Sequence, residues 1–173
     1  MHRQFDSAKA QFRDRLYSYA WYSLRSKADA EDVVQEAFLK LWEHSANVDP
    51  AQTGAWLMRV TQNLIVDYVR RRKARQTWTD TDADPDAIAQ DDTPDLQHQR
   101  TLKRIVEHSI AQLQDPYRTT VILREIQGLN YQEIAHILRV SVDHVKTDLF
   151  RGRRKLREIV SAHPLYHHDL LGS

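Results

Sequence analysis

Cysteine is absent from the 173 residues of the sequence, which excludes disulfides, thiolate zinc sites and thiol redox sensing and agrees with a reducing cytoplasm. Glycine and proline are scarce, with four and five residues, and alternating β-branched segments are almost missing. We therefore expect an all-α protein. No apolar run approaches the roughly 20 residues that span a bilayer, and residues 1–12 lack the apolar core of a signal peptide. We expect a cytoplasmic protein without membrane insertion.

The net charge of +1 conceals a segregation of charge along the chain. Residues 1–76 carry 13 Lys and Arg against 9 Asp and Glu, and residues 98–173 carry 12 against 8. Between them, residues 77–97 carry seven Asp, no Lys or Arg and few large apolar groups, so burial cannot offset the entropy of ordering. We expect two small helical domains, 1–76 and 98–160, joined by a flexible acidic linker at 77–97 and followed by a tail at 161–173.

The first domain shows three helical patterns. Apolar residues recur at helical spacing over residues 8–26 and again over residues 29–42, where Asp29 is the expected N-cap. After a short polar loop at residues 44–50, a long helix is expected from about Thr53 to Arg75. Its basic end carries more positive charge than a helix C-terminus requires. Trp56 on this helix is expected mainly in the core, and a role as a stacking platform is the alternative.

The second domain ends in helix-turn-helix spacing. Its helices are expected from near Leu96, from Tyr117 to Gln127, and over residues 131–157, where Arg139-Val140-Ser141 interrupts the period and Ser141 is the expected N-cap. The residue that closes the first helix of such a motif is often Gly, because it adopts a left-handed conformation; here it is Arg139. A cluster of cations on the last helix suits phosphate binding. Its members are Lys146, Arg151, Arg153, Arg154, Lys155 and Arg157.

Three motifs in order carry a resemblance to a known family. DAEDVVQEAFLKLW at residues 29–42 resembles the region 2.2 helix of bacterial sigma factors, residues 54–72 resemble regions 2.3 to 2.4, and residues 113–157 resemble region 4. Two modules with a short linker are similar to the extracytoplasmic-function (ECF) subfamily of the sigma-70 family, over about residues 8–158. The resemblance implies a subunit that binds core RNA polymerase, directs it to specific promoters and helps to open the DNA, without a cofactor, a metal or enzyme chemistry.

The resemblance also implies partners and site residues. Region 2.2 would dock on the β′ coiled coil of core polymerase, the β flap would be a second polymerase contact, and an anti-sigma factor would regulate the protein. The expected polymerase-binding residues are Asp32, Gln35, Glu36 and Leu39. The expected minus-10 residues, which would hold an extruded base and the strand backbone, are Asn47, Arg59, Asn63, Arg70, Arg71 and Arg72. The expected minus-35 residues are Asp143, His144, Lys146, Thr147, Arg151, Arg153 and Arg154.

Asp148 departs from the family pattern, because family members commonly carry Arg two residues beyond the helix Lys, which is Lys146 here. A carboxylate on the reading helix would repel phosphate unless it accepts a hydrogen bond from a cytosine amino group. The promoter sequence therefore cannot be carried over from relatives. The acidic linker has two interpretations, a segment that occupies a basic polymerase channel or a plain solvated tether.

Other functions stay open on the residues alone. A freestanding helix-turn-helix regulator would use the same C-terminal domain, with an N-terminal half that senses a ligand or dimerises; the region 2.2 motif argues against it. A metal-dependent nuclease would need Asp80, Asp82, Asp84 and Asp86, which lie in a stretch without a rigid scaffold. In the tail, a weak metal site is the alternative to a frayed end, and its candidate ligands are His163, His167 and His168.

Overall fold

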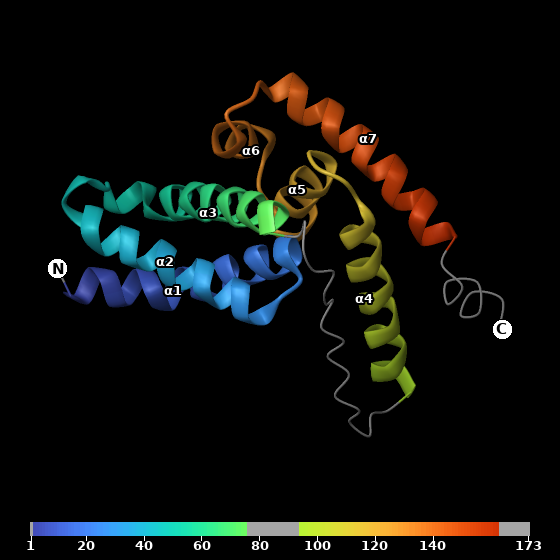
Figure 1. The fold of residues 1–173 in the computed structure, drawn as a ribbon, viewed down its shortest axis with the longest axis horizontal. Coiled ribbons are helices and arrows are strands. Elements are labelled where there is room, and N and C mark those ends of the chain that lie inside the picture. Colours follow the sequence, from blue (N-terminus) through green and yellow to red (C-terminus); the bar gives the residue numbers. More distant parts are fainter. Residues whose placement is uncertain (1, 76–93, 163–173) are drawn as a thin grey trace.

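The computed structural model describes residues 2–75 and 94–162 (Figure 1). The helices are α1 His2–Leu24, α2 Lys27–His44, α3 Thr53–Arg75, α4 Pro94–Gln112, α5 Tyr117–Val121, α6 Tyr131–Leu138 and α7 Val142–Ser161. Two short 3-10 turns, η1 Ser45–Asn47 and η2 Pro50–Gln52, join α2 to α3, and a π-helical segment η3 Ile122–Ile126 continues α5. The described residues contain no strand, which confirms the all-α prediction. None of their helices is long and apolar enough to cross a membrane.

The first module is a three-helix bundle of α1, α2 and α3 (Figure 1). Its centre is built on Leu16 and Tyr19 of α1, Phe38 of α2 and Leu57 of α3, which are all at most 4% exposed. Burial raises the pKa of Tyr19, and its hydroxyl donates a hydrogen bond to Gln62 of α3. A buried hydroxyl needs such a partner, so this bond fixes α3 against α1.

Helix α2 begins two residues earlier than predicted. Its N-cap is Ser26, whose Oγ accepts a hydrogen bond from the backbone N–H of Asp29 at 3.3 Å. The prediction that Asp29 caps the helix was therefore wrong, because the hydroxyl of Ser26 already satisfies that end of the helix. Asp29 instead lies in the first turn, where the helix dipole favours a negative charge.

The second module contains the predicted helix-turn-helix, formed by α6 and α7. Asn130 and Glu133 form a capping box at the start of α6, and Ser141 accepts a hydrogen bond from the N–H of His144 at 3.1 Å at the start of α7. Arg139 closes α6 with φ +57°, in the left-handed region. The turn is thus wound as in motifs with Gly at this position, although Arg must adopt a conformation that a Cβ disfavours.

The two modules pack against one another. Helix α3 contacts α6, and α1 contacts both η3 and α4. At this junction, Arg15 donates a hydrogen bond to the carbonyl oxygen of Gln127 at 3.0 Å, and Arg25 lies 4.0 Å from the carboxylate of Glu107. Because α4 begins at Pro94, the last four residues of the predicted 77–97 linker are helical. The preceding part of that segment lies outside the described residues.

Gly152→Val should lower the free energy of unfolding by about 1 to 3 kcal/mol, because the new side chain overpacks the crossing of α7 and α5. A Cβ at Gly152 would lie 2.8 Å from Cγ2 of Val121, which is fully buried, and 3.4 Å from the carbonyl oxygen of Tyr117. Thermal unfolding followed by circular dichroism measures the change.

Arg151→Val is the matched control, because Arg151 is exposed on the same helix and the variant carries the same cost of a β-branched residue. Equal melting temperatures for the two variants would contradict a close approach of α7 to α5.

Candidate nucleic-acid and polymerase interface

The predicted polymerase-binding residues form one exposed stripe on α2. Asp32, Gln35, Glu36 and Leu39 follow each other at helical spacing and are all exposed, while the opposite side of the helix supplies buried core residues. Leu39 is 62% exposed. Glu36 lies 3.6 Å from Lys40 in an exposed ion pair, which contributes little to stability. The fold thus leaves this polar stripe, with an apolar residue within it, open to a partner.

A groove between α2 and α3 brings residues of two predicted sites together. It has a volume of about 490 Å³, and Glu36 of α2 lines it opposite Asn63, Arg70 and Arg71 of α3. On the other side of the α2 stripe, a hollow of about 460 Å³ towards α1 is lined by Gln35 and Leu39. The stripe is therefore a ridge between two depressions, a shape that suits contact with a partner helix.

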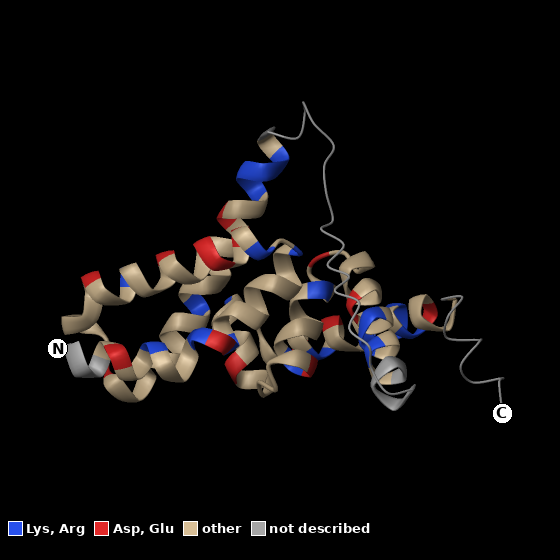
Figure 2. Cartoon of the chain, turned by 90° about the horizontal axis from the view of Figure 1, so that it is seen from below, with Lys and Arg blue, Asp and Glu red and all other residues tan. Residues whose placement is uncertain are grey.

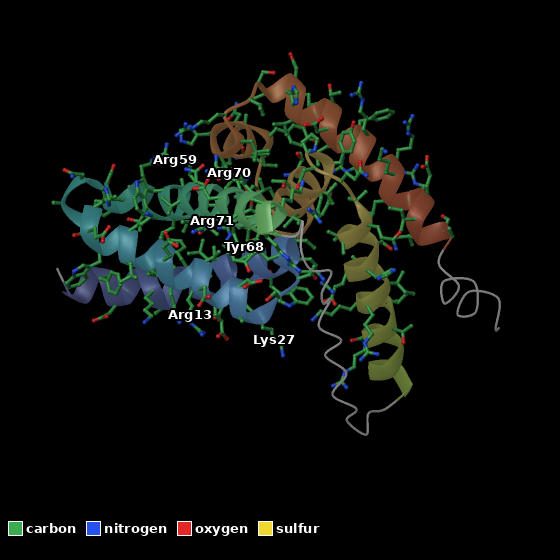
Figure 3. The ribbon with its side chains drawn as sticks, viewed as in Figure 1. Arg13, Lys27, Arg59, Tyr68, Arg70 and Arg71 are labelled. Carbon is green, nitrogen blue, oxygen red and sulfur yellow. The ribbon has the colours of Figure 1, made fainter. Side chains whose placement is uncertain are left out.

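Helix α3 carries a basic row that ends at its C-terminus. Arg59, Asn63 and Arg70 recur at spacings of four and seven residues and share one side of the helix. Figure 3 labels Arg59, Arg70 and Arg71 along α3. Figure 2 shows Lys and Arg gathered at the end of α3, close to the row of carboxylates on α2. Arg70 pairs with Asp67 at 3.1 Å. With Arg72, which is half-buried, this end of α3 presents dense positive charge.

Asn47 lies apart from the rest of the predicted minus-10 set. It ends η1 at the start of the connection to α3, and the rise of the helix places Arg70 roughly 25 Å further along α3. Beside this connection, sequence reasoning missed an apolar hollow of about 310 Å³ lined by Phe5, Trp42 and Val48. Trp42 packs edge-on against Phe5, with ring centroids 5.2 Å apart. Trp56 is half-buried against the core, which agrees with the expected core position.

Helix α7 presents the predicted minus-35 residues on its outer side. Asp143, Thr147, Phe150 and Arg154 recur along the exposed face, and His144, Lys146 and Arg151 flank them. Phe150 is 70% exposed and was missed as a site residue. The available signal was an aromatic residue at a position where the amphipathic pattern requires a polar one.

Arg153 is held by an acidic partner within the fold. Its Nε and Nη2 donate hydrogen bonds to one carboxylate oxygen of Glu125 in η3, at 2.8 and 2.6 Å. Hydrogen bonding to Glu125 raises the pKa of Arg153. Lys146 makes a comparable but helix-internal pair with Asp143 at 3.2 Å. Of the predicted phosphate contacts on α7, Arg153 thus lies on the side nearest to η3.

Asp148 does not lie on the reading face as expected. It is 6% exposed, and its Oδ2 lies 3.2 Å from Nε2 of His144, one turn earlier on α7. Helical periodicity explains the correction, because Asp148 falls next to Leu149 and one turn before Gly152, which are both buried. The expectation that Asp148 repels phosphate or reads cytosine from the surface is therefore wrong.

Two groups of candidate metal ligands lie outside the described residues. They are Asp80, Asp82, Asp84 and Asp86 in the acidic segment and His163, His167 and His168 in the tail. Among the described residues, no group of three or more His, Asp or Glu side chains could hold a metal ion.

The geometry agrees with the family comparisons. Residues 10–75 match the family model for sigma-70 region 2, and residues 103–156 match that for sigma-70 region 4. The chain belongs to the sigma-70 family of RNA polymerase sigma factors. Region 2 corresponds to α1, α2 and α3, and region 4 begins within α4 and ends in α7. This membership confirms the sequence-based interpretation and favours a promoter-directing sigma factor over a freestanding regulator.

Relatives place the sigma factor in the ECF subfamily. It is 33% identical to the ECF sigma factor SigE of Mycolicibacterium smegmatis over 92% of this chain, and it spans 62% of that protein's length. It is 29% identical to the ECF sigma factor SigM of Bacillus subtilis over 89% of this chain and 93% of that one. The fold matches the sigma factor RpoE of Bartonella quintana, solved in complex with the anti-sigma factor NepR, with a TM-score of 0.75, 22% identity and coverage of 91% and 97% of the two chains.

The phenol of Tyr68 on α3 should titrate near pH 12, because burial and a hydrogen bond to Asp29 of α2 raise its pKa from the ordinary 10 to about 12. A phenol whose pKa is raised by folding stabilises the fold fully below pH 10, and this stabilisation is lost as the pH rises through 12. The difference in tyrosinate absorbance between the wild type and Tyr68→Phe isolates this group. A midpoint near pH 10 would show that Tyr68 does not tie α3 to α2.

Proposed function

We propose that this ECF sigma factor docks on core RNA polymerase through α2, holds the opened minus-10 strand along α3 and reads the minus-35 duplex with α7. The observation that carries the proposal is the exposure of all three predicted sets on separate faces of one fold, with the polymerase stripe and the minus-10 row meeting at one groove. The factor acts in the cytoplasm through binding energy and performs no covalent chemistry.

The polymerase contact rests on the ridge of α2. Asp32 and Glu36 are like charges one turn apart, a pair that is slightly destabilising in an isolated helix. Basic groups on the β′ coiled coil would compensate both charges and set the orientation of docking. Leu39, at 62% exposed, adds apolar area that only a partner can bury. Both features favour a protein surface over nucleic acid as the ligand of α2.

The strand contact rests on the basic row of α3. Single-stranded DNA is bound by a positive groove that follows the backbone together with side chains that contact the bases. Arg70 and Arg71 supply the charge and Asn63 supplies an amide at the same groove, while Asn47 is placed to contact a base further along the strand. An extruded base exposes its Watson–Crick edge, which an Asn side chain can hydrogen-bond.

The duplex contact rests on α7, and two further partners follow from family membership. The exposed face of α7 combines cations for phosphates with His144 and Thr147 near its N-terminal end, where recognition helices contact base edges. We include the β flap of polymerase as a second docking surface and an anti-sigma factor as regulator. Support for the latter is that the Bartonella sigma factor of similar fold forms a complex with one.

Glu36→Arg should weaken association with core polymerase by at least about tenfold, because it sets a cation against basic partner groups at a cost of a few kcal/mol. Run-off transcription with core polymerase on genomic DNA fragments gives the functional readout. The wild type should start discrete transcripts, and the variant should start few or none. Failure of the wild type to start any transcript would overturn the proposed function.

Asp14→Arg is the matched control for this experiment, since it makes the same charge change on α1 at a side chain that is 95% exposed. The control should co-purify with core polymerase like the wild type. If Glu36→Arg also co-purifies normally while it stays folded, the docking surface is not on this side of α2.

Lys146→Ala should weaken promoter binding by the holoenzyme and flatten its salt dependence, because one lost phosphate contact lowers the slope of log K against log salt by about 0.9. Binding to a promoter duplex at several salt concentrations measures the slope. Lys103→Ala on α4, an exposed lysine outside the proposed site, should leave it unchanged. An unaltered slope for Lys146→Ala would mean that this lysine does not contact the DNA backbone.

A further inference from the structure

The buried carboxylate of Asp148 constrains the exposed imidazole of His144. The side chain of Asp148 is 8% exposed, that of His144 is 56% exposed, and Oδ2 of Asp148 lies 3.2 Å from Nε2 of His144. An ionised carboxylate only accepts hydrogen bonds, so the hydrogen between the two groups belongs to Nε2 of His144. Leaving a buried carboxylate without a partner is costly, and therefore this contact holds the ring in place.

The remaining chemistry of His144 follows from that contact. When Nε2 of a neutral imidazole carries the hydrogen, Nδ1 is an acceptor. His144 lies three residues after the N-cap of α7, whose hydroxyl holds its backbone N–H at 3.1 Å. Both the backbone and the ring of His144 are thus fixed before any ligand arrives. A side chain of this kind loses little entropy on binding, which favours specificity.

We propose that Asp148 is a positioning residue for promoter recognition: it fixes His144 as a hydrogen-bond acceptor that selects an amino group of adenine or cytosine in the minus-35 major groove. Adenine N6 and cytosine N4 are the donors on the major-groove edges of the bases, whereas guanine and thymine present acceptors there. An acceptor at Nδ1 of His144 therefore favours the first two bases and is repelled by the others. The inference rests on the proposed docking of α7 in that groove.

Two variants of Asp148 separate positioning from a merely structural role. Asp148→Asn retains an oxygen that accepts from Nε2, and Asp148→Leu has a similar volume but no acceptor. Leu is compatible with a buried position, so both variants are expected to fold. With the holoenzyme, the wild type should prefer adenine or cytosine at one minus-35 position by roughly tenfold. Asp148→Asn should retain this preference, and Asp148→Leu and His144→Ala should each lose it.

The spectroscopic test observes the ring directly. The nitrogen chemical shifts of His144 in the free protein should report hydrogen on Nε2 and none on Nδ1, and Asp148→Leu should yield a mixture of both tautomers. The inference is overturned if Nδ1 carries the hydrogen, if both nitrogens do, or if Asp148→Leu keeps the base preference of the wild type. A salt slope that responds to Lys146→Ala together with a base preference that ignores His144 would refute this inference alone and leave the docking of α7 intact.

Discussion

The packing of α1 is the interaction on which the rest of the described structure depends. Leu16, Tyr19 and Ala20 of this helix are at most 1% exposed, and α1 contacts α2, α3, η3 and α4. Its apolar side completes the core of the first module, while Arg15 on its flank holds the carbonyl of Gln127 in the second. A rotation of α1 would therefore disturb the bundle and the junction together, and with them the relative placement of the α3 and α7 surfaces.

The junction is weaker than either module that it joins. The Arg25–Glu107 pair spans 4.0 Å, the Arg15 hydrogen bond is exposed, and interactions of these kinds each contribute at most about 1 kcal/mol. A cleft of about 410 Å³ remains between α3 and α6, so part of the contact is not close-packed. Separating the modules thus costs less than unfolding one. A polymerase that holds both at a set distance would let two weak DNA contacts act as one strong grip.

The sequence predicted the features that short-range rules determine. Thr53 and Arg75 bound α3 as expected, and the hydroxyl of Ser141 caps α7 because capping needs only a side chain and an N–H three residues on. Contacts between distant residues were beyond reach: Glu125 and Arg153 are 28 positions apart, and no periodicity links them. Asp148 was misplaced because a carboxylate is expected at the surface unless a partner is known, and that partner, His144, emerges only from the three-dimensional packing.

Burial gives two acid–base pairs on α7 opposite consequences. Asp143 and Lys146 lie 3.2 Å apart with side chains 91% and 56% exposed, and such a pair exchanges its partner for phosphate at little cost. Asp148 and His144 lie at the same distance, but water cannot replace a partner of the buried carboxylate. One pair therefore leaves its cation available to the DNA backbone, while the other constrains a ring that faces the bases. Within a single helix, depth below the surface decides which side chain contributes affinity and which contributes selectivity.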